Sequence, residues 1–443
     1  MHGSSKAGTR NITANSQRFL DVALRIGQRL SEDAIWHDGR CTWTGDDVDY
    51  VNDEWKVIHQ TVDAYLYSGN AGIARFLILC WQASDDDRLR ETAMGAIRQS
   101  LHFPEQHPGE KLPLGLYDGL TGVALVATDI GHQLQEHEFI EGAQQLTEEI
   151  CRRIDAGEIP ETIDLVSGIA GILTGLVQLA KTTGNPSLYN TCHILSEQLL
   201  AQALHTDYGW YWAETAQQDS HAGLCGLGHG AAGIAHALIE YSQMTGDEDC
   251  LSAARQAMRY ERSWFHPWES NWPDNRDTDE KGEHVSDQEL VYPVYWCHGA
   301  AGVGLSRLRA YQLTGDKNDL AEAGSAIQVA TRHAKQLIKE AKRTRRLSAD
   351  TNLSVCHGLG SIIDLFVYAH QVLGRDEFLQ RARDIGTFCI RISTGKREYW
   401  RCGIHDGGET PGLMLGLAGI GYNFLRLQHP TALTPAGMVV DFT

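Results

Sequence analysis

The sequence lacks the long apolar runs of a membrane protein. It contains no stretch of 18 consecutive apolar residues, and a membrane-spanning helix needs a run of about that length. The first residues, MHGSSKAGTRNITANS, also lack the apolar core of a signal peptide. We therefore expect a cytoplasmic protein without membrane insertion, whose residues 1–14 are a disordered tail or residues left by an expression vector.

Basic residues are also scarce. Lys and Arg number 38 against 57 Asp and Glu, which gives a formal net charge of −19. Unspecific nucleic-acid binding requires a basic surface that displaces counterions from phosphates. The charge balance argues against such binding, and we expect no nucleic-acid partner.

Disulfide and strand patterns are missing as well. The ten cysteines are scattered and show neither the density of a disulfide scaffold nor the CxxC spacing of a zinc ribbon. Most of them are therefore expected to be reduced and buried. No strand-like alternation of any length competes with the helical patterns, so the fold class is predicted to be all-α.

A short motif, GxxG followed by an apolar stretch, is repeated along the chain. The sixth copy has Ser361 in place of the second glycine. The seven copies are SGNAGIARFL from Ser68, DGLTGVALVA from Asp118, SGIAGILTGL from Ser167, HGAAGIAHAL from His229, HGAAGVGLSR from His298, HGLGSIIDLF from His357 and LGLAGIGYNF from Leu415.

A second glycine marks the period of the repeat. Gly184, Gly246, Gly315 and Gly374 each follow the first motif glycine of their repeat by 16 residues. A glycine after a helix, followed by Asn or Asp that can cap the next helix, is typical of two helices joined by a tight turn. Each repeat is therefore predicted to be an apolar helix followed by a charged, amphipathic helix.

Seven such repeats predict a seven-fold, double-layered α/α toroid, with the apolar helices inside and the charged helices outside. An open solenoid is the alternative. We expect a single toroid domain over residues 15–430, interrupted by a flap-like insertion at about 263–290, and a C-terminal tail over 431–443. The insertion carries tryptophans among Pro, Asp and Glu, and its alternative interpretation is a solvated loop.

Equivalent positions of the repeats should lie at one end of the toroid. The residue before the first motif glycine is His229, His298 and His357 in three consecutive repeats, and Cys297 and Cys356 precede two of these histidines. Two cysteines and a histidine are enough to bind zinc with an open fourth position, which indicates catalysis. The alternative is that the cysteines are small core residues.

Two further residues are candidates for acid–base chemistry. His229 follows a glycine instead of a cysteine, so it can face the metal as an acid or base, or else be a capping or core histidine. Asp164, four residues before Gly168, can orient a catalytic histidine or belong to a solvated loop. Asp118 is expected to be a turn or cap residue.

At these residues the sequence resembles the lanthionine synthetase C-like cyclases. The resemblance covers most of the chain and is carried by GLYDGLTG, IDLVSGIAG, GLGHGAAGIAHAL, YWCHGAAGVGL, SVCHGLG and TPGLMLGLAGIGYNFLRL. CTWTGDD, NWPDNR and the closing segment look most like the cyclase domain of class II lanthipeptide synthetases. The resemblance implies a seven-fold α/α toroid with one zinc ion per chain.

The resemblance also implies roles for individual residues. The zinc ligands fall on Cys297, Cys356 and His357, the catalytic histidine on His229 and the catalytic aspartate on Asp164. The implied reaction adds a peptide cysteine thiol to dehydroalanine or dehydrobutyrine and forms a (methyl)lanthionine thioether ring. His298 stands where many members have tyrosine, and it is expected to share the catalytic role.

The resemblance further implies a dehydrated precursor peptide with a leader as the substrate, and a dehydratase that is fused or separate. Pro293 stands where some members have an arginine, which removes any role of that arginine here. Two other functions remain open: addition of glutathione or another small thiol to dehydroamino acids, and peptide binding without catalysis. A glycosidase would need paired carboxylates, and a prenyltransferase would need a carboxylate ligand and a partner subunit.

Overall fold

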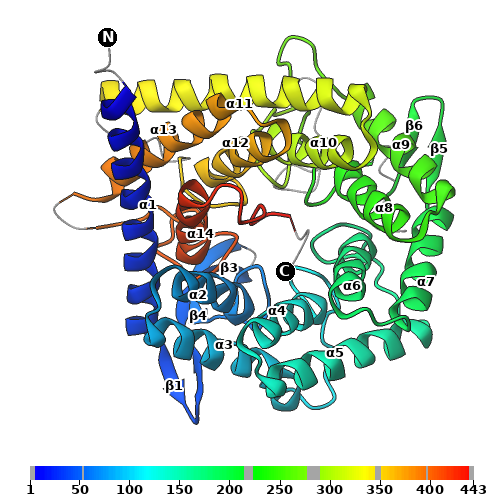
Figure 1. Ribbon diagram of the computed structural model, residues 1–443. Coiled ribbons are helices and arrows are strands. Elements are labelled where there is room, and N and C mark those ends of the chain that lie inside the picture. The colour runs from blue at the N-terminus through cyan, green and yellow to red at the C-terminus, as the bar shows by residue number, and fades with distance from the viewer. Residues whose placement is uncertain are drawn as a thin grey trace. The chain divides into compact units, whose positions relative to one another are not determined.

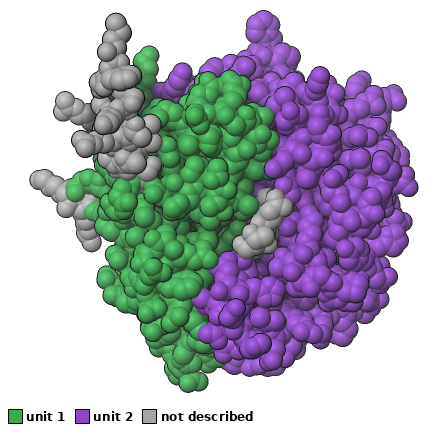
Figure 2. All heavy atoms as spheres, viewed as in Figure 1, with its two compact units in different colours: residues 1–100, 337–436 green, residues 101–336, 437–443 purple. Residues whose placement is uncertain are grey.

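The computed structural model describes residues 5–51, 54–213, 223–276, 290–344, 351–395 and 398–438. The chain folds into two compact units: unit 1, residues 1–100 and 337–436, and unit 2, residues 101–336 and 437–443. Unit 1 is green and unit 2 is purple in Figure 2. The single domain expected over residues 15–430 stays a prediction.

One helix follows each of the seven GxxG motifs, as the sequence predicts. The N-cap is in every case the first motif glycine, and the first turns of these helices are buried on nearly all sides. We call them the motif helices: α2 (Asn70–Ser84), α4 (Leu120–Leu134), α6 (Ile169–Thr183), α8 (Ala231–Thr245), α10 (Ala300–Thr314), α12 (Leu359–Leu373) and α14 (Leu417–Gln428).

The second motif glycine has a steric role. A Cβ atom at Gly233 would collide with the carbonyl oxygen of Leu227, and one at Gly302 would collide with that of Trp296. In the six repeats that have this glycine, the missing side chain lets the loop before the motif helix fold back against the first turn of that helix. These loops carry the predicted site residues.

A second set of helices alternates with the motif helices along the chain, and all of them except α7 (Leu188–Ala201), whose one Asp, Glu, Lys or Arg residue is Glu197, are rich in charge as predicted. Gly184, Gly246, Gly315 and Gly374 end their motif helices in the left-handed conformation. Within the described residues, no helix combines the length and apolarity needed to cross a membrane. The amphipathic helices are α1 (Ser5–Asp33), α3 (Asp87–Gln106), α5 (His137–Asp155), α7 (Leu188–Ala201), α9 (Glu248–Ser263), α11 (Lys317–Thr344) and α13 (Asp376–Ser393).

The seventh repeat takes its amphipathic helix from the other end of the chain. In unit 1, α1 lies along α14 (Figure 1), and Phe19 stacks on Phe424 with ring centroids 6.2 Å apart. Helix α1 begins at Ser5, so the structure has helix over residues 5–14 of the expected tail over 1–14, whereas residues 1–4 lie outside the described residues. Once the apolar face at Phe19 is packed, extending the helix costs little, because propagation is far easier than nucleation.

Three hairpins were not expected from the sequence. They pair β1 (Ile35–His37) with β2 (Arg40–Thr42), β3 (Thr44–Val51) with β4 (Glu54–Thr61) and β5 (Leu204–Thr206) with β6 (Gly209–Tyr211). In the longest hairpin Val48 pairs with Val57 and Tyr50 with Trp55. Their spacing of two is a strand signal, so the expectation of no strand-like alternation was wrong here.

One described residue near the C-terminus, Gly437, is packed in unit 2. In unit 2 the indole Nε1 of the buried Trp296 donates a hydrogen bond of 2.6 Å to the carbonyl of Gly437. Gly437, which lies in the expected tail over 431–443, is therefore packed against the residue next to Cys297, and the tail itself stays a prediction. Nearly half of the expected flap at about 263–290 lies outside the described residues, which omit 277–289.

A buried ion-pair network joins three motif helices of unit 2. Glu240 of α8 accepts hydrogen bonds from Arg309 of α10 at 2.5 Å and from Lys181 of α6 at 2.7 Å. Burial raises the pKa of Glu240, but the charge and hydrogen bond of Arg309 outweigh this effect and lower the pKa to about 2. The network therefore stabilises unit 2 only while Glu240 is ionised.

This network gives a pH dependence that a single substitution isolates. Since the folded-state pKa of Glu240 is below its unfolded value, the stabilisation is present above about pH 4.5 and is lost as the pH falls toward 2. Glu240→Gln is expected to lower the free energy of unfolding by about 3 kcal/mol at neutral pH. Urea unfolding at several pH values should show this difference shrinking in acid. A difference that does not change with pH would contradict the assignment.

Candidate functional site

Asp164 and His229 form a hydrogen-bonded pair in unit 2. Asp164 lies in the loop before α6 and His229 directly before α8, and Oδ2 of the aspartate is 2.6 Å from Nδ1 of the histidine. The other carboxylate oxygen accepts the backbone N–H groups of Ser167 at 2.7 Å and Gly168 at 2.9 Å. Because both oxygens are held, the carboxylate fixes the ring orientation of His229 and directs its Nδ1 proton toward Asp164.

The environment of the pair favours a protonated imidazole. Asp164 is buried, whereas the His229 side chain is one-third (33 %) exposed. Burial lowers the pKa of His229, but the hydrogen bond and charge of Asp164 outweigh it and hold the pKa above its ordinary value. Nε2 of His229 is thus suited to accept a proton and to donate it again.

Glycines bring the His229 loop against the segment that carries Cys297. Gly226 has a φ of +112°, and a Cβ atom there would collide with the Cys297 carbonyl oxygen. A Cβ atom at Gly228 would lie 3.1 Å from the Cys297 Cα. The N–H of Gly228 donates to the Cys297 carbonyl at 3.2 Å, and the carbonyl of Gly228 accepts a hydrogen bond from the N–H of Leu165 at 3.1 Å. The segments of Asp164, His229 and Cys297 are therefore adjacent.

His298 is buried beside His229. The two ring centroids are 5.6 Å apart, and Nδ1 of His298 is 3.3 Å from the carbonyl of Cys225. Burial lowers the pKa of His298 to about 4, although Asp274 opposes the shift. The imidazole is therefore neutral near pH 7, and within the described part of the chain its Nε2 is buried without a hydrogen-bond partner. The structure brings His298 to the pair, and its catalytic role stays a prediction.

Asp118 has a partner that the sequence analysis did not anticipate. Instead of capping its own helix, it accepts a 2.5 Å hydrogen bond from the hydroxyl of Ser167 in the next repeat. Burial raises the pKa of Asp118. Ser167 therefore links two aspartates, because its N–H binds Asp164 and its hydroxyl binds Asp118. The only sequence signal for this link is that Ser167 stands at the repeat position where the three following repeats have histidine.

The other predicted metal ligands lie in unit 1, in the loop before α12. Cys356 is buried, and its N–H donates to the carbonyl of Met414 at 3.0 Å. Nε2 of His357 is 2.8 Å from the carbonyl of Gly403. A carbonyl accepts only, so Nε2 carries the proton and Nδ1 the lone pair. Metal-ligating histidines usually donate their second N–H in this way, so the loop fits a zinc ligand set.

The three predicted zinc ligands belong to different units. Cys297, which is partly exposed, is part of unit 2, whereas Cys356 and His357 are part of unit 1. Across the described ranges, no group of three or more His, Cys, Asp or Glu side chains is arranged to hold a metal ion. The zinc set therefore stays a prediction, based on the donor types and on the hydrogen bond of His357.

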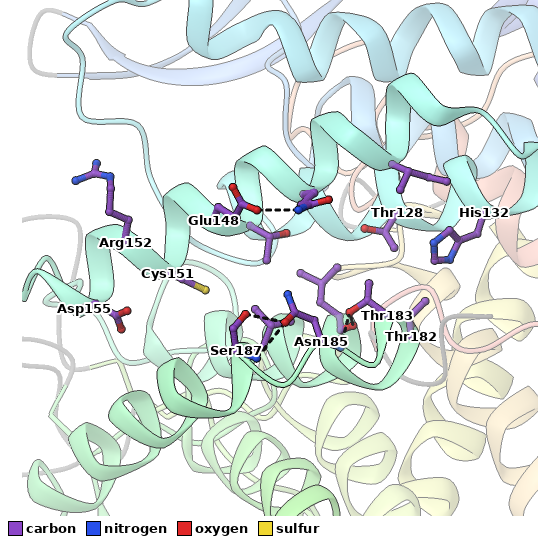
Figure 3. Close-up of a pocket in the computed structure, with 15 residues that line it drawn as sticks. Thr128, His132, Glu148, Cys151, Arg152, Asp155, Thr182, Thr183, Asn185 and Ser187 are labelled. Atoms are coloured by element: carbon purple, nitrogen blue, oxygen red, sulfur yellow. Dashed lines mark hydrogen bonds between the residues drawn. The ribbon is translucent and has the colours of Figure 1, made fainter.

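A cavity of about 710 Å³ lies elsewhere in unit 2, between α4 and α5 on one side and α6 and α7 on the other (Figure 3). The hydroxyls of Thr128, Thr147 and Thr183 bind carbonyls of their own helices, so their polar groups are already used. Cys151 also lines the cavity, and burial raises the pKa of its thiol. The cavity contains none of the six predicted site residues and no activated nucleophile, so we do not assign the reaction to it.

Comparison with known proteins identifies the relatives of this chain. The sequence profile of the lanthionine synthetase C-like protein family matches residues 60–438. Among solved structures, nisin cyclase superimposes with a TM-score of 0.61 at 17 % sequence identity, covering 82 % of this chain and 88 % of that one. This likeness confirms the fold class, the α/α toroid that the repeats predict.

Two curated relatives differ in how much of their length is matched. The lacticin 481/lactococcin biosynthesis protein LcnDR2 of Lactococcus lactis subsp. lactis is 24 % identical over 204 residues, which cover 46 % of this chain. The match spans only 20 % of LcnDR2. The glutathione S-transferase LANCL1 of Danio rerio is 22 % identical over 381 residues, which cover 82 % of each chain.

Proposed function

This chain belongs to the lanthionine synthetase C-like protein family, and on that basis we propose that it is a cyclase that closes thioether rings in a dehydrated precursor peptide. A cysteine thiol of the peptide adds to the β-carbon of dehydroalanine or dehydrobutyrine. The new bond joins sulfur to the β-carbon, the double bond is lost, and the thiol proton is replaced by a proton on the α-carbon. No oxidant or reductant is needed.

The observation that carries the proposal is the Asp164–His229 hydrogen bond, 2.6 Å long, beside the Cys297 segment. Such an addition needs one group that takes a proton from sulfur and delivers a proton to carbon. An imidazole whose Nδ1 is held by a carboxylate can do both through Nε2. The raised pKa of His229 supports this role, because Asp164 stabilises the imidazolium between the two transfers.

The residues act in a defined order in this proposal. His229 accepts the thiol proton at Nε2 while its Nδ1–H stays on Asp164. After sulfur has attacked the β-carbon, negative charge develops on the α-carbon and its carbonyl oxygen. His229 then donates the Nε2 proton to the α-carbon and returns to its neutral form. His298, neutral at pH 7 because burial lowers its pKa to about 4, directs its Nδ1–H toward the carbonyl of Cys225, so its Nε2 lone pair is available to accept a proton beside His229 and share the role of base.

A zinc ion held by Cys297, Cys356 and His357 would have an open fourth position for the substrate thiol and would lower the pKa of that thiol. The hydrogen bond from His357 to Gly403 supports this ligand set, since it leaves Nδ1 as the coordinating atom. Two thiolate ligands would make the site formally anionic and keep the substrate sulfur nucleophilic.

The names of two relatives support the proposed substrate class. LcnDR2 is named as a lacticin 481/lactococcin biosynthesis protein and the solved structure as a nisin cyclase. We extend from these names to a dehydrated precursor peptide with a leader, delivered by a dehydratase that is fused or separate.

A second function is favoured by LANCL1, which matches this chain over 82 % of both lengths and is named a glutathione S-transferase. In this alternative the same residues add glutathione to a dehydroamino acid of another molecule. The bond changes are identical, and only the source of the thiol differs.

One assay separates these functions. A peptide with one cysteine and one dehydroalanine is incubated with the purified chain, with and without glutathione, and then analysed for free thiol and mass. Cyclisation should remove the thiol without changing the mass. A mass gain equal to one glutathione would identify the alternative. Binding of the peptide without either change would leave a peptide-binding protein without catalysis.

A further inference from the structure

Glu261 is a buried carboxylate of α9 that the proposed reaction does not use. It is fully buried, and its Oε1 accepts the backbone N–H of Gly226 at 2.8 Å. Its Oε2 accepts a hydrogen bond of 2.7 Å from Arg307, which is also fully buried. The guanidinium of Arg307 in turn donates to Glu322 at 2.6 Å. Glu261 thus connects a buried arginine to the backbone of the His229 loop.

The position of Gly226 determines where His229 lies. Gly226 precedes His229 by three residues, and Gly226 and Gly228 both pack directly against the Cys297 backbone. The other hydrogen bonds to the backbone of this loop are between neutral groups, such as that from the Cys225 N–H to Asn275 at 2.9 Å. Hydrogen bonds to a charged acceptor are about twice as strong as neutral ones. Glu261 is therefore a strong anchor of the loop.

The partner of Glu261 connects the anchor to the other half of the site. Arg307 lies on α10, the motif helix that begins at Ala300 directly after Cys297 and His298. Helix α10 therefore follows the predicted zinc ligand Cys297 and also carries Arg307. Arg307 binds the carboxylate of Glu261, which in turn holds the His229 loop. A shift of Arg307 or Glu261 would change the position of His229 relative to Cys297.

We propose that Glu261, held by Arg307, is a positioning residue that fixes residues 225–229 so that His229 is placed for proton transfer. The inference rests on the proposed function for its effect on catalysis, whereas its effect on the loop is independent of any activity.

Unit 2 contains a matched control. Glu240 is also fully buried and is paired with Arg309, two residues from Arg307 on the same helix. Its carboxylate binds the side chains of Arg309 and Lys181 instead of a backbone N–H of the site loop. Loss of either carboxylate leaves a buried arginine poorly paired and destabilises the fold. Only the loss of Glu261 should alter the site loop.

The test compares Glu261→Gln with Glu240→Gln at a temperature at which both variants are folded by circular dichroism. Hydrogen exchange of the peptide that contains Gly226 should become at least about tenfold faster in Glu261→Gln, since its amide loses a charged acceptor. It should stay unchanged in Glu240→Gln. The kcat of ring closure should fall at least about tenfold in Glu261→Gln, with KM within about twofold, because small misplacements of a catalytic group are costly. Glu240→Gln should keep kcat within about twofold of the wild type.

The outcomes separate the inference from the function on which it rests. Unchanged exchange at Gly226, or an equal loss of kcat in both variants, would overturn the positioning role. A wild-type protein that forms no thioether would overturn the proposed function, while the exchange measurement would still decide whether Glu261 holds the loop. If Glu261→Gln does not fold, Arg307→Lys and its control Arg309→Lys replace the pair. Lysine keeps the charge but loses the planar guanidinium, which in Arg307 bridges the carboxylates of Glu261 and Glu322.

Discussion

His229→Asn is expected to lower the kcat of thioether formation by about 10² to 10⁴-fold, the usual contribution of a positioned general acid–base. Asparagine is smaller than histidine and can keep a hydrogen bond to Asp164, but it cannot carry a proton between sulfur and the α-carbon. Binding of the peptide should change little, because the role proposed for the ring is in proton transfer. Steady-state kinetics with the dehydrated peptide, together with a binding titration, would measure both quantities.

His132→Asn is the control for this substitution. His132 is an exposed histidine of α4 that lines the separate cavity of unit 2 (Figure 3), so its loss should leave kcat unchanged. A His229→Asn variant with a wild-type kcat would remove His229 from the mechanism. A weaker Kd for the peptide with an unchanged kcat would make His229 a binding residue instead.

The repeats were predictable because their signals are local. A glycine that caps a helix and a second glycine that contacts the preceding loop act within a few residues, and both recur in register. The origin of the seventh amphipathic helix was not predictable in this way, because α1 reaches α14 from the opposite end of the sequence. The β3–β4 hairpin is a different case. Its alternation around Val48 and Tyr50 was present in the sequence but was outweighed by the helical pattern of the rest.

The site residues that could be predicted from the sequence are those that the family resemblance covers. His229 and Asp164 come from different repeats, and the structure places them 2.6 Å apart. The supporting residues could not be found from the sequence. Ser167 bonds to Asp118 across 49 residues, and Glu261 bonds to Gly226 across 35. These partners are selected by the packing of neighbouring helices. Ser167 and Asp118 stand at the repeat position that His229 occupies, but nothing in the sequence pairs them with each other, and Glu261 stands in no spacing that indicates a site.

Cys356→Ala is expected to remove most of the bound zinc. The wild-type protein should contain about one zinc per chain, and loss of one of three protein ligands should weaken binding by more than about hundredfold. Metal analysis of the purified variant, and competition with a chelator, would measure this without any activity assay. Ring closure should fall in parallel, because the substrate thiol would keep a pKa of about 8.5 and remain mostly protonated at neutral pH.

Cys389→Ala separates ligand loss from damage to the core. Cys389 lies on α13 in the same unit and is also buried, and burial raises the pKa of its thiol to about 12. This substitution should cost stability but leave the zinc content at the wild-type level, because a thiol that stays protonated is a poor ligand. If both variants kept their zinc, Cys356 would be a core residue and not a ligand. If both lost it, the metal would depend on the packing of unit 1. Only loss confined to Cys356→Ala supports the ligand set that the repeated Cys-His pair predicts.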